Sequence, residues 1–510
     1  MKKDVKNIKS ALLKSRSEKA AKRSIEVDES QVRNPDVEND VYVGLYSKGM
    51  THDATTMVCE ESRIKELQLA LETGKQSDFD DLDKAGARKQ ASPQGSLGLE
   101  LYGADPEGLS MAAAPALNSR EAAAEMVEVY AKHLLREKPF KDYEDGSQEI
   151  QDALDAINAF GDDFVGPKEN GLVTAKTLFR GSSPGCTVGG YISQLFLHTI
   201  GVGNFAYEPQ GPTKTGVYGI TKANFVEIQN GNVPVAQTID PVLKYMFNGR
   251  QLGSTVHIDL VFQHFYEAAA ILLNAGVGRN AGFPDLANEG AFLTQGGPVE
   301  LTTGIAEVSR HALKAAWVQK WRKHLRLRPE ATAARVVAEL DGDLPVGTVH
   351  ADLKNSAVVA SIAAANLAAG GENKAFLPLQ YAEGSPTHPA YPAGHATISG
   401  ACATILKIYL ADAAWSTTGL AERQAAGDGL SVEAYAGANA GQITIHGEIN
   451  KLAHNVALGR DYAGVHYRSD SELLLGEKVA IQYYKDSKAL QNEAIGDIVF
   501  TGFDGSTITL

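Results

Sequence analysis

Lysine, arginine and histidine gather in three short segments of an otherwise acidic chain. The segments are WVQKWRKHLRLRPEA (317–331), YAEGSPTHPAYPAGHATISG (381–400) and HNVALGRDYAGVHYRSDSELLLG (454–476). The chain has 510 residues, and 48 Lys and Arg against 62 Asp and Glu give a formal net charge of −14. Because cationic and imidazole side chains are the donors with which proteins bind small oxyanions, the three segments point to a local anion site.

The first segment predicts two cations beside a helix end. Trp317, Lys320 and His324 recur at helical spacing and so share one face of a predicted helix. Arg328 precedes Pro329, which disfavours a helical backbone at Arg328 and places this residue at the helix end. An ordinary basic helix face in solvent would show the same pattern, so this segment does not define a site by itself.

The second segment predicts a proline-rich loop that runs into a helix. Gly394 stands just before that helix, where backbone N–H groups can face an anion at the positive end of the helix dipole. His388 and His395 flank this point. The alternative interpretation is a loop with two incidental histidines.

The third segment contains a histidine that a carboxylate can hold. Asp470 follows His466 by four residues, a spacing that predicts both side chains on one helix face. From there the carboxylate can bind the second ring nitrogen of the imidazole. Arg460 precedes His466 across the short stretch DYAGV. A His–Asp pair at this spacing is common by chance, so its weight comes from the combination of the three segments.

Together the segments read K-x7-R-P, P-A-G-H and G-R-x5-H-x3-D. This combination resembles the anion site shared by vanadium-dependent haloperoxidases and the type-2 phosphatidic-acid-phosphatase-like acid phosphatases. Seven residues (321–327) separate the lysine from the arginine, as in algal-type bromoperoxidases, whereas the phosphatases place six. Stretches such as NSREAAAEMVEVY (118–130) and EGAFLTQGGPVELTTGIAEV (289–308) extend the similarity over roughly residues 40–480.

The resemblance implies a bound vanadate ion. His466 would be its metal ligand through one ring nitrogen, and Asp470 would fix the proton on the other nitrogen. The vanadate oxygens would be surrounded by cationic side chains, a backbone N–H and a second imidazole, which come from Lys320, Arg328, Arg460, Gly394 and His395.

The resemblance also implies catalytic roles. His395 would hydrogen-bond the apical hydroxide, and His388 would act as acid–base when hydrogen peroxide enters. Lys320 would also polarise the peroxide so that a halide can attack it. Trp317, three residues before the lysine, occupies a position that lies near the halide site in this family.

One position departs from the family pattern. Where the family usually carries a serine before the Gly-His pair, this chain has Ala393. Alanine cannot supply the hydroxyl that donates to a vanadate oxygen. The loss of one hydrogen bond to a charged group costs about 1.5–3 kcal/mol, so we expect weaker vanadate binding rather than an inactive protein.

These features predict a vanadium-dependent haloperoxidase. It would use hydrogen peroxide to oxidise a halide, with bromide or iodide as the expected halides. The product would be a hypohalous acid equivalent that halogenates small organic substrates. The alternative is an acid phosphatase with His466 as a phosphorylated nucleophile, because phosphate and vanadate share shape and donors. A catalytically inactive binding protein or scaffold is a third hypothesis, for which Ala393 is the sole support.

Helical periodicity dominates the chain and predicts an all-α fold. Ser119 begins one predicted helix as its N-cap, and others are expected at 146–160, 256–276, 303–325, 330–340, 355–369, 395–413, 446–458 and 468–486. Residues 497–510 predict a β hairpin. The resemblance implies two four-helix bundles, which we divide into an N-terminal arm and irregular segment (1–118), a first helical bundle (119–285) and a second helical bundle with the vanadate site (286–510).

Composition limits partners and location. The acidic balance excludes nonspecific nucleic-acid binding, which needs a basic face. The longest uncharged stretch, 355–371, is too short and too weakly apolar to span a membrane. Three distant cysteines form no disulfide framework, and the basic N-terminal run lacks the apolar core of a secretory signal, so we expect a cytoplasmic protein. The resemblance implies a homodimer or a larger homo-oligomer.

Overall fold

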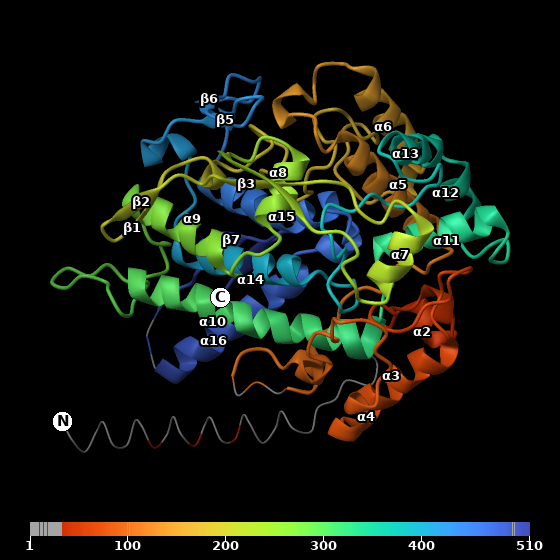
Figure 1. Cartoon of the computed structure of the whole chain (residues 1–510). Helices are drawn as coiled ribbons and strands as arrows, with labels where there is room; N and C mark the ends of the chain where they lie inside the picture. The colour runs from red at the N-terminus through yellow and green to blue at the C-terminus, as the bar shows by residue number, and fades with distance from the viewer. Residues whose placement is uncertain are drawn as a thin grey trace.

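The computed structural model describes residues 33–98, 100, 102–491, 493 and 495–510, together with Ser10, Lys14 and Glu18. Most of the basic N-terminal run therefore lies outside the described residues. Within them the chain is mainly helical, and the strands form only short pairs (Figure 1). The prediction of an all-α fold with minor β hairpins is confirmed. In this described part, no helix has the length and apolar character needed to cross a membrane.

The α-helices vary from one turn to six turns. They are α2 (Pro35–Glu38), α3 (Glu61–Thr73), α4 (Gln76–Asp80), α5 (Arg120–Leu135), α6 (Gln148–Asn158), α7 (Lys222–Gln229), α8 (Gly249–Thr255), α9 (Gln263–Asn274), α10 (Pro298–Val318), α11 (Pro329–Asp341), α12 (Ala351–Asn355), α13 (Ala357–Ala368), α14 (Gly394–Tyr409), α15 (Ile445–Tyr462) and α16 (Leu474–Gln491).

Shorter helical turns join these helices. One of them, η7 (Gln319–His324), has π-helical geometry. The others are 3₁₀ turns: η1 (Tyr42–Gly44), η2 (Pro93–Leu97), η3 (Pro106–Gly108), η4 (Phe140–Asp142), η5 (Gly161–Asp163), η6 (Gln194–Phe196), η8 (Trp415–Thr418) and η9 (Ser469–Ser471).

Four antiparallel strand pairs lie at the periphery. They are β1 (Ile200–Val202) with β2 (Phe205–Tyr207), β3 (Gly211–Thr215) with β4 (Thr238–Lys244), β5 (Arg423–Ala425) with β6 (Val432–Ala434), and β7 (Val499–Thr501) with β8 (Thr507–Thr509). The predicted C-terminal hairpin is confirmed, with Phe500 opposite Ile508. The other three pairs were missed, because most of their strands are too short to show an alternating pattern.

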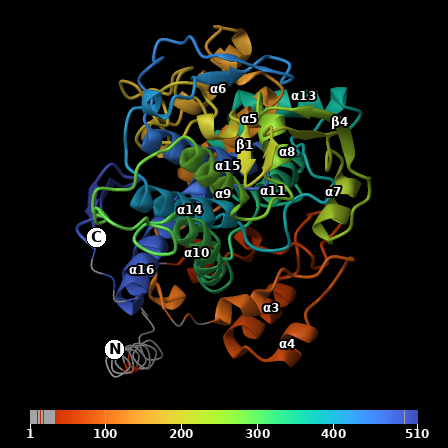
Figure 2. The same cartoon turned by 90° about the vertical axis from the view of Figure 1, so that its left-hand side faces the viewer.

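Helix α14 is the centre of the fold. It packs along α10, α15 and α16, and Figure 2 shows it directly above α10 with α16 alongside. Every residue of α14 is buried except His395. A helix that is buried on all sides must be enclosed by others, so its one partly exposed residue, His395 in the first turn, marks the place where the enclosure opens.

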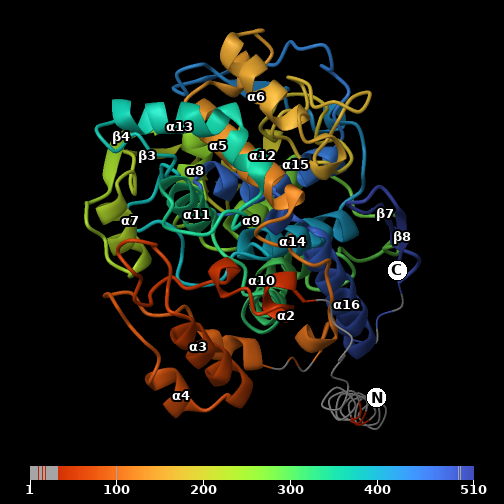
Figure 3. The same ribbon diagram turned by 90° about the vertical axis from the view of Figure 1, so that its right-hand side faces the viewer.

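A second group of helices surrounds α5, which packs against α6, α11, α12 and α13 (Figure 3). Helix α5 begins as expected, because the Ser119 hydroxyl accepts a hydrogen bond from the N–H of Ala122 at 3.1 Å. Helix α15 joins the two groups through its contacts with α5 and α14. A single hydrophobic core runs through both, from Met57 to Phe503.

Three predicted helices are wrong at the residues that matter most for function. The helix expected at 256–276 begins only at Gln263, the one expected at 303–325 gives way to the π turn η7 after Val318, and the one expected at 468–486 begins at Leu474. In each case a polar side chain of the interrupted stretch bonds to a distant segment: Asp259 to His395, Lys320 to the carbonyl of Pro389, and Arg468 to Glu128. Interrupted helices of this kind recur at functional sites.

Candidate active site

The structure brings the three basic segments together. Lys320, in η7, donates from Nζ to the carbonyl oxygens of Pro389 and Ala390 at 2.7 and 2.9 Å. Arg328 donates from Nε to the carbonyl of His388 at 3.0 Å and from Nη1 to the carbonyl of Val465 at 2.7 Å. The two cations of the first segment therefore hold the backbone of the other two.

The backbone of Arg328 is extended, as the following proline predicts, with φ −83° and ψ 154°. The residue lies at the start of α11 and not at the end of the preceding helix. The predicted shared helix face of Trp317, Lys320 and His324 is also wrong, because α10 ends at Val318. The His324 ring packs instead edge-on against Tyr391, 4.7 Å away.

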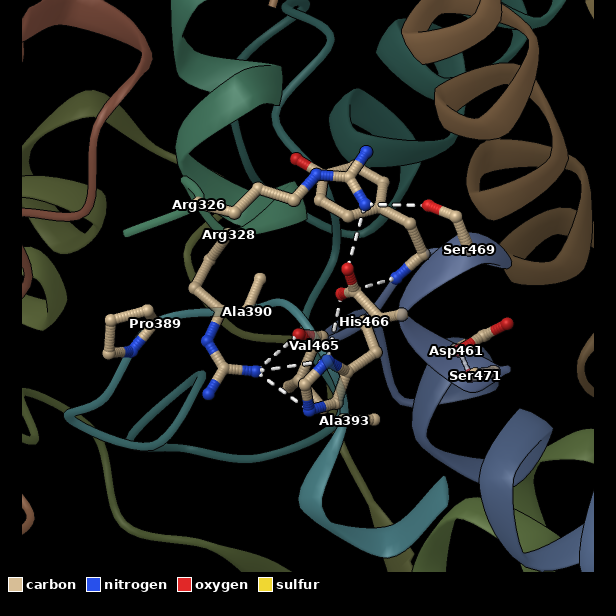
Figure 4. Close-up of polar contacts among 12 residues, drawn as sticks. Arg326, Arg328, Pro389, Ala390, Ala393, Asp461, Val465, His466, Ser469 and Ser471 are labelled. Atoms are coloured by element: carbon tan, nitrogen blue, oxygen red, sulfur yellow. Dashed lines mark hydrogen bonds and ion pairs between the residues drawn. The ribbon is translucent and has the colours of Figure 1, made fainter. Parts of the chain in front are cut away.

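His466 is held at both ring nitrogens (Figure 4). Its Nδ1 lies 2.9 Å from Oδ2 of Asp470, and its Nε2 lies 2.9 Å from Nη1 of Arg328. Because an arginine can only donate, Nε2 must accept and the ring proton belongs on Nδ1, toward the carboxylate. Burial, together with the cations Arg328 and Lys320, lowers the pKa of His466 well below its ordinary value, so the ring is neutral.

The spacing predicted that His466 and Asp470 share one helix face, but their contact does not arise on a helix. Both residues follow the end of α15, and Asp470 lies in the 3₁₀ turn η9. The chain folds back on itself there, and Oδ2 of Asp470 also accepts the N–H of Tyr467 at 3.1 Å. The spacing therefore predicted the right pair through the wrong local geometry.

Two residues that the sequence analysis missed complete this arrangement. Arg326 donates from Nη1 to Oδ1 of Asp470 and from Nη2 to Oε2 of Glu125, both at 2.7 Å. Glu125 also accepts the N–H of Ser469 at 2.7 Å. Arg326 lay within the basic segment, where its spacing could have suggested a role. Glu125, on α5, carried no local signal.

Asp259 is a third missed residue. It lies in the interruption between α8 and α9, and its Oδ1 is 2.9 Å from Nε2 of His395. Burial lowers the pKa of His395, and the facing carboxylate partly counteracts this effect. The mistaken helix at 256–276 concealed this position, because it assigned Asp259 to a regular helix turn.

The buried cations of the site lack carboxylate partners. In the described part of the chain, no salt bridge joins Lys320, Arg328 or Arg460 to a carboxylate, and the Nε atom of Arg460 is buried without a hydrogen-bond partner. Burial lowers the pKa of Lys320 well below its ordinary value and that of Arg328 to about 10. Such a cluster is stabilised when an anion enters, so the donor set fits an oxyanion.

Burial and the nearby Arg460 lower the pKa of His395 in the first turn of α14, so the start of this helix lies near the cluster. Gly394 is the first residue of the helix rather than the residue before it, so its N–H is among those that no helix carbonyl accepts. Ala393 is the N-cap and is fully buried, and its N–H donates to the carbonyl of Asp470 at 2.7 Å. The missing hydroxyl thus lies at a cap position, where a serine would also serve the helix.

The aromatic ring of Trp317 lies beside His388, with 4.8 Å between ring centroids. Its indole N–H donates to the carbonyls of Ala91 and Ser92 at 3.2 and 3.1 Å. Burial, together with Lys320, lowers the pKa of His388 well below its ordinary value. The segment around Ala91 and Ser92 therefore lies against Trp317 beside the loop before α14. His388 is a neutral imidazole in that loop.

Comparisons with known proteins identify relatives of this chain. The family model of the VCPO second helical-bundle domain matches residues 301–493, which contain all three segments. The vanadium-dependent bromoperoxidase of Corallina pilulifera is 30% identical over 95% of this chain and 94% of that protein. The vanadium-dependent bromoperoxidase of Ascophyllum nodosum is 31% identical over 77% and 72% of the two chains.

The fold also has a solved counterpart. The homohexameric structure of the second vanadate-dependent bromoperoxidase (AnII) from Ascophyllum nodosum superimposes with a TM-score of 0.89. The alignment covers 98% of this chain and 90% of that one at 24% identity, and so shows likeness in fold. Identity to the curated relatives over nearly the whole length shows that this chain belongs to the vanadium-dependent bromoperoxidases, within the vanadium-dependent haloperoxidase family.

Proposed function

We propose that this protein is a vanadium-dependent haloperoxidase that oxidises bromide or iodide with hydrogen peroxide to a hypohalous acid equivalent, which halogenates small organic substrates. One observation carries the proposal. A neutral His466 presents the lone pair of Nε2 to a buried cluster of cations that has no carboxylate within salt-bridge distance among the described residues. An oxyanion whose metal has one open coordination site requires both features: a nitrogen lone pair for the metal and cations for the oxygens.

Vanadate fits the donor set. His466 Nε2 would be the metal ligand, and Arg328, which now donates to that lone pair, would donate instead to an oxyanion oxygen. Lys320, Arg460 and the N–H of Gly394 would supply further donors around it. When bound, vanadate would supply a Lewis acid that activates hydrogen peroxide without a redox change at the metal.

The remaining residues have separate proposed roles toward hydrogen peroxide and the halide. His388, neutral and buried beside Arg328, can accept a proton from incoming hydrogen peroxide. His395, whose Nε2 faces Asp259, can hydrogen-bond an oxygen on the open side of the site. Lys320, which the carbonyls of Pro389 and Ala390 hold in place, would polarise the peroxide. Trp317, packed on His388, places an aromatic wall where the halide would approach.

We also propose that the protein is a homo-oligomer and that it resides in the cytoplasm. The AnII bromoperoxidase forms a homohexamer, and this chain shares its fold over nearly its whole length, which supports a homo-oligomer here. Cys59, Cys186 and Cys402 are all buried and unpaired, which fits a reducing compartment such as the cytoplasm.

A paired assay tests the function. The vanadate-loaded protein is given bromide or iodide with hydrogen peroxide and a phenolic indicator, and the protein without vanadate is given p-nitrophenyl phosphate. We expect halide-dependent halogenation and no phosphate hydrolysis above background. Phosphate hydrolysis that depends on His466, without halide oxidation, would favour the acid phosphatase. Loss of both reactions would favour a binding protein.

A further inference from the structure

Two contacts hold the buried guanidinium of Arg460, and neither is an ion pair. Nη1 donates to the carbonyl of Val256 at 2.6 Å. The guanidinium carbon lies over the face of the Tyr381 ring, 5.3 Å from its centroid. In the part of the chain that the structure describes, no carboxylate comes within salt-bridge distance of Arg460, and its Nε is buried without a hydrogen-bond partner. One donor of this cation is therefore available to a ligand.

The Tyr381 ring is itself fixed at two places. The residue is fully buried, and its hydroxyl donates to the carbonyl of Gly253 in α8 at 2.6 Å. The imidazole of His257 stacks on the ring, with 3.7 Å between centroids and 6° between the planes. A ring that is bonded at its tip and covered by a stacked neighbour has little room to tilt, so the position of its face is defined.

Glu383 holds the stacked imidazole in turn. Its Oε1 lies 2.6 Å from Nε2 of His257. Burial would raise the pKa of Glu383, but the bond to His257 lowers it to about 2, so the carboxylate is ionised and can only accept. The hydrogen therefore belongs on Nε2 of His257. Burial lowers the pKa of His257 below its ordinary value, so this ring is neutral at pH 7 and adds no second cation beside Tyr381.

An aromatic face attracts a cation without neutralising it. A carboxylate in the place of the Tyr381 ring would pair the charge of Arg460, and an entering oxyanion would then have to compete with that carboxylate. The partial negative charge of the ring face offsets part of the cost of burying the guanidinium and leaves its full positive charge for the anion. Such a partner suits a cation that is buried before its anion binds.

We propose that Tyr381, fixed by His257 and Glu383, is a positioning residue that holds the guanidinium of Arg460 in place for the bound oxyanion. This inference rests on the proposed function, in which the oxyanion is vanadate. Tyr381 begins the second basic segment, where the sequence gave it no role. It also packs against Val465, directly before His466, so an effect on His466 through Val465 is the competing explanation.

The test separates the ring face from the hydroxyl. Tyr381→Phe keeps the face and loses the bond to Gly253, whereas Tyr381→Leu loses both. Vanadium-free protein is dialysed against orthovanadate, and bound vanadium per chain gives the dissociation constant without any turnover. We expect Tyr381→Phe to stay within about twofold of wild type and Tyr381→Leu to bind about five- to tenfold more weakly. The same series with inorganic phosphate should give the same order.

A ring of unchanged shape tests the electrostatic part. Pentafluorophenylalanine at position 381 fills nearly the same space as phenylalanine, but its face no longer carries partial negative charge. We expect vanadate binding about fivefold weaker than in Tyr381→Phe. This variant keeps the packing and so decides the question even if Tyr381→Leu does not fold. Equal affinity in the two variants would overturn the proposal.

Tyr191→Leu is the matched control. The Tyr191 hydroxyl donates to the carbonyl of Phe179 at 2.6 Å, and the guanidinium carbon of Arg180 lies over its ring at 5.4 Å, so the substitution removes the same two contacts elsewhere in the fold. We expect a loss of stability in urea like that of Tyr381→Leu, with vanadate affinity within about twofold of wild type. An equal loss of affinity in both variants would mean that Tyr381 supports the fold only, which would overturn its role.

A double-variant cycle identifies the residue through which Tyr381 acts. Arg460→Met removes the cation, and in that background Tyr381→Leu should weaken vanadate binding no further. The same loss with and without Arg460 would overturn the proposal in favour of the contact with Val465. If wild-type protein binds vanadate but oxidises no halide, the proposed function fails, and these affinities still decide the role of Tyr381.

Discussion

Nδ1 of His466 lies 2.9 Å from Oδ2 of Asp470, and the other oxygen of the same carboxylate binds Arg326 at 2.7 Å. The imidazole is therefore oriented by a carboxylate that is itself fixed by a buried ion pair. Glu125 continues this chain of contacts into α5. The orientation of the proposed vanadate ligand thus depends on the packing between the two groups of helices.

Replacing Asp470 by asparagine should weaken vanadate binding roughly ten- to hundredfold, the range for changes behind a metal ligand. The amide keeps the shape but no longer demands the proton on Nδ1, so Nε2 becomes a poorer ligand. Vanadate titration with bromide oxidation as the readout measures the half-saturating concentration. Asp504→Asn, at an exposed carboxylate in the C-terminal hairpin, is the control. Half-saturation and maximal rate equal to wild type would show that Asp470 does not act on His466.

Arg326 and Asp470 should be energetically coupled. Arg326→Met leaves two carboxylates buried without their cation, which typically costs about 3–5 kcal/mol of unfolding free energy. In the double variant with Asp470→Asn one of these penalties disappears. We therefore expect the double variant to be more stable, by about 0.5–3 kcal/mol, than the sum of the single effects requires. Urea unfolding of the four proteins measures this, and additive effects would contradict the coupling.

Ala393→Ser should raise the stability of the fold and tighten vanadate binding. A serine hydroxyl at this N-cap can accept an N–H of the first turn of α14, worth about 0.5–2 kcal/mol, while it donates its proton to a bound anion. We expect a higher thermal midpoint without vanadate and binding of vanadate tighter by about 1–2 kcal/mol. Ala393→Cys, of similar size but a weak donor, should show little of either gain. Unchanged or weaker vanadate binding in Ala393→Ser would mean that the vanadate oxygen near this position already has another hydrogen-bond donor.

Acid should destabilise the fold through its buried histidines. Burial lowers the pKa of His52 and of His198 from 6.5 to about 4. Between these values the unfolded chain binds protons that the folded chain does not, so the unfolding free energy falls as the pH is lowered from 6.5 to 4. Each histidine contributes about 1.4 kcal/mol per pH unit. Urea unfolding at pH 7.5, 5.5 and 4.5 tests this, and His52→Gln should reduce the slope. Equal stability at all three values would contradict it.

The sequence predicted the helical class and most helix positions, because long amphipathic patterns survive in any tertiary context. The three basic segments were also visible, since residue type and spacing alone distinguish them. Asp259 and Glu125 were not predictable, because each reaches the site from a distant element and shows no local pattern. The interruption before α9 and the turn at Asp470 were missed for a related reason: each is held by a long-range bond, to His395 and to Arg326, that no local pattern shows.

The central claim is that vanadate binds at His466 and enables halide oxidation. The direct measurement is a titration of orthovanadate into vanadium-free protein, with bromide-dependent halogenation and bound vanadium per chain recorded together. We predict no activity at the start, saturation at one vanadium per chain, competition by phosphate, and neither binding nor activity in His466→Ala. Full activity without vanadium, unaffected by phosphate, or vanadium binding in His466→Ala equal to wild type would contradict the account.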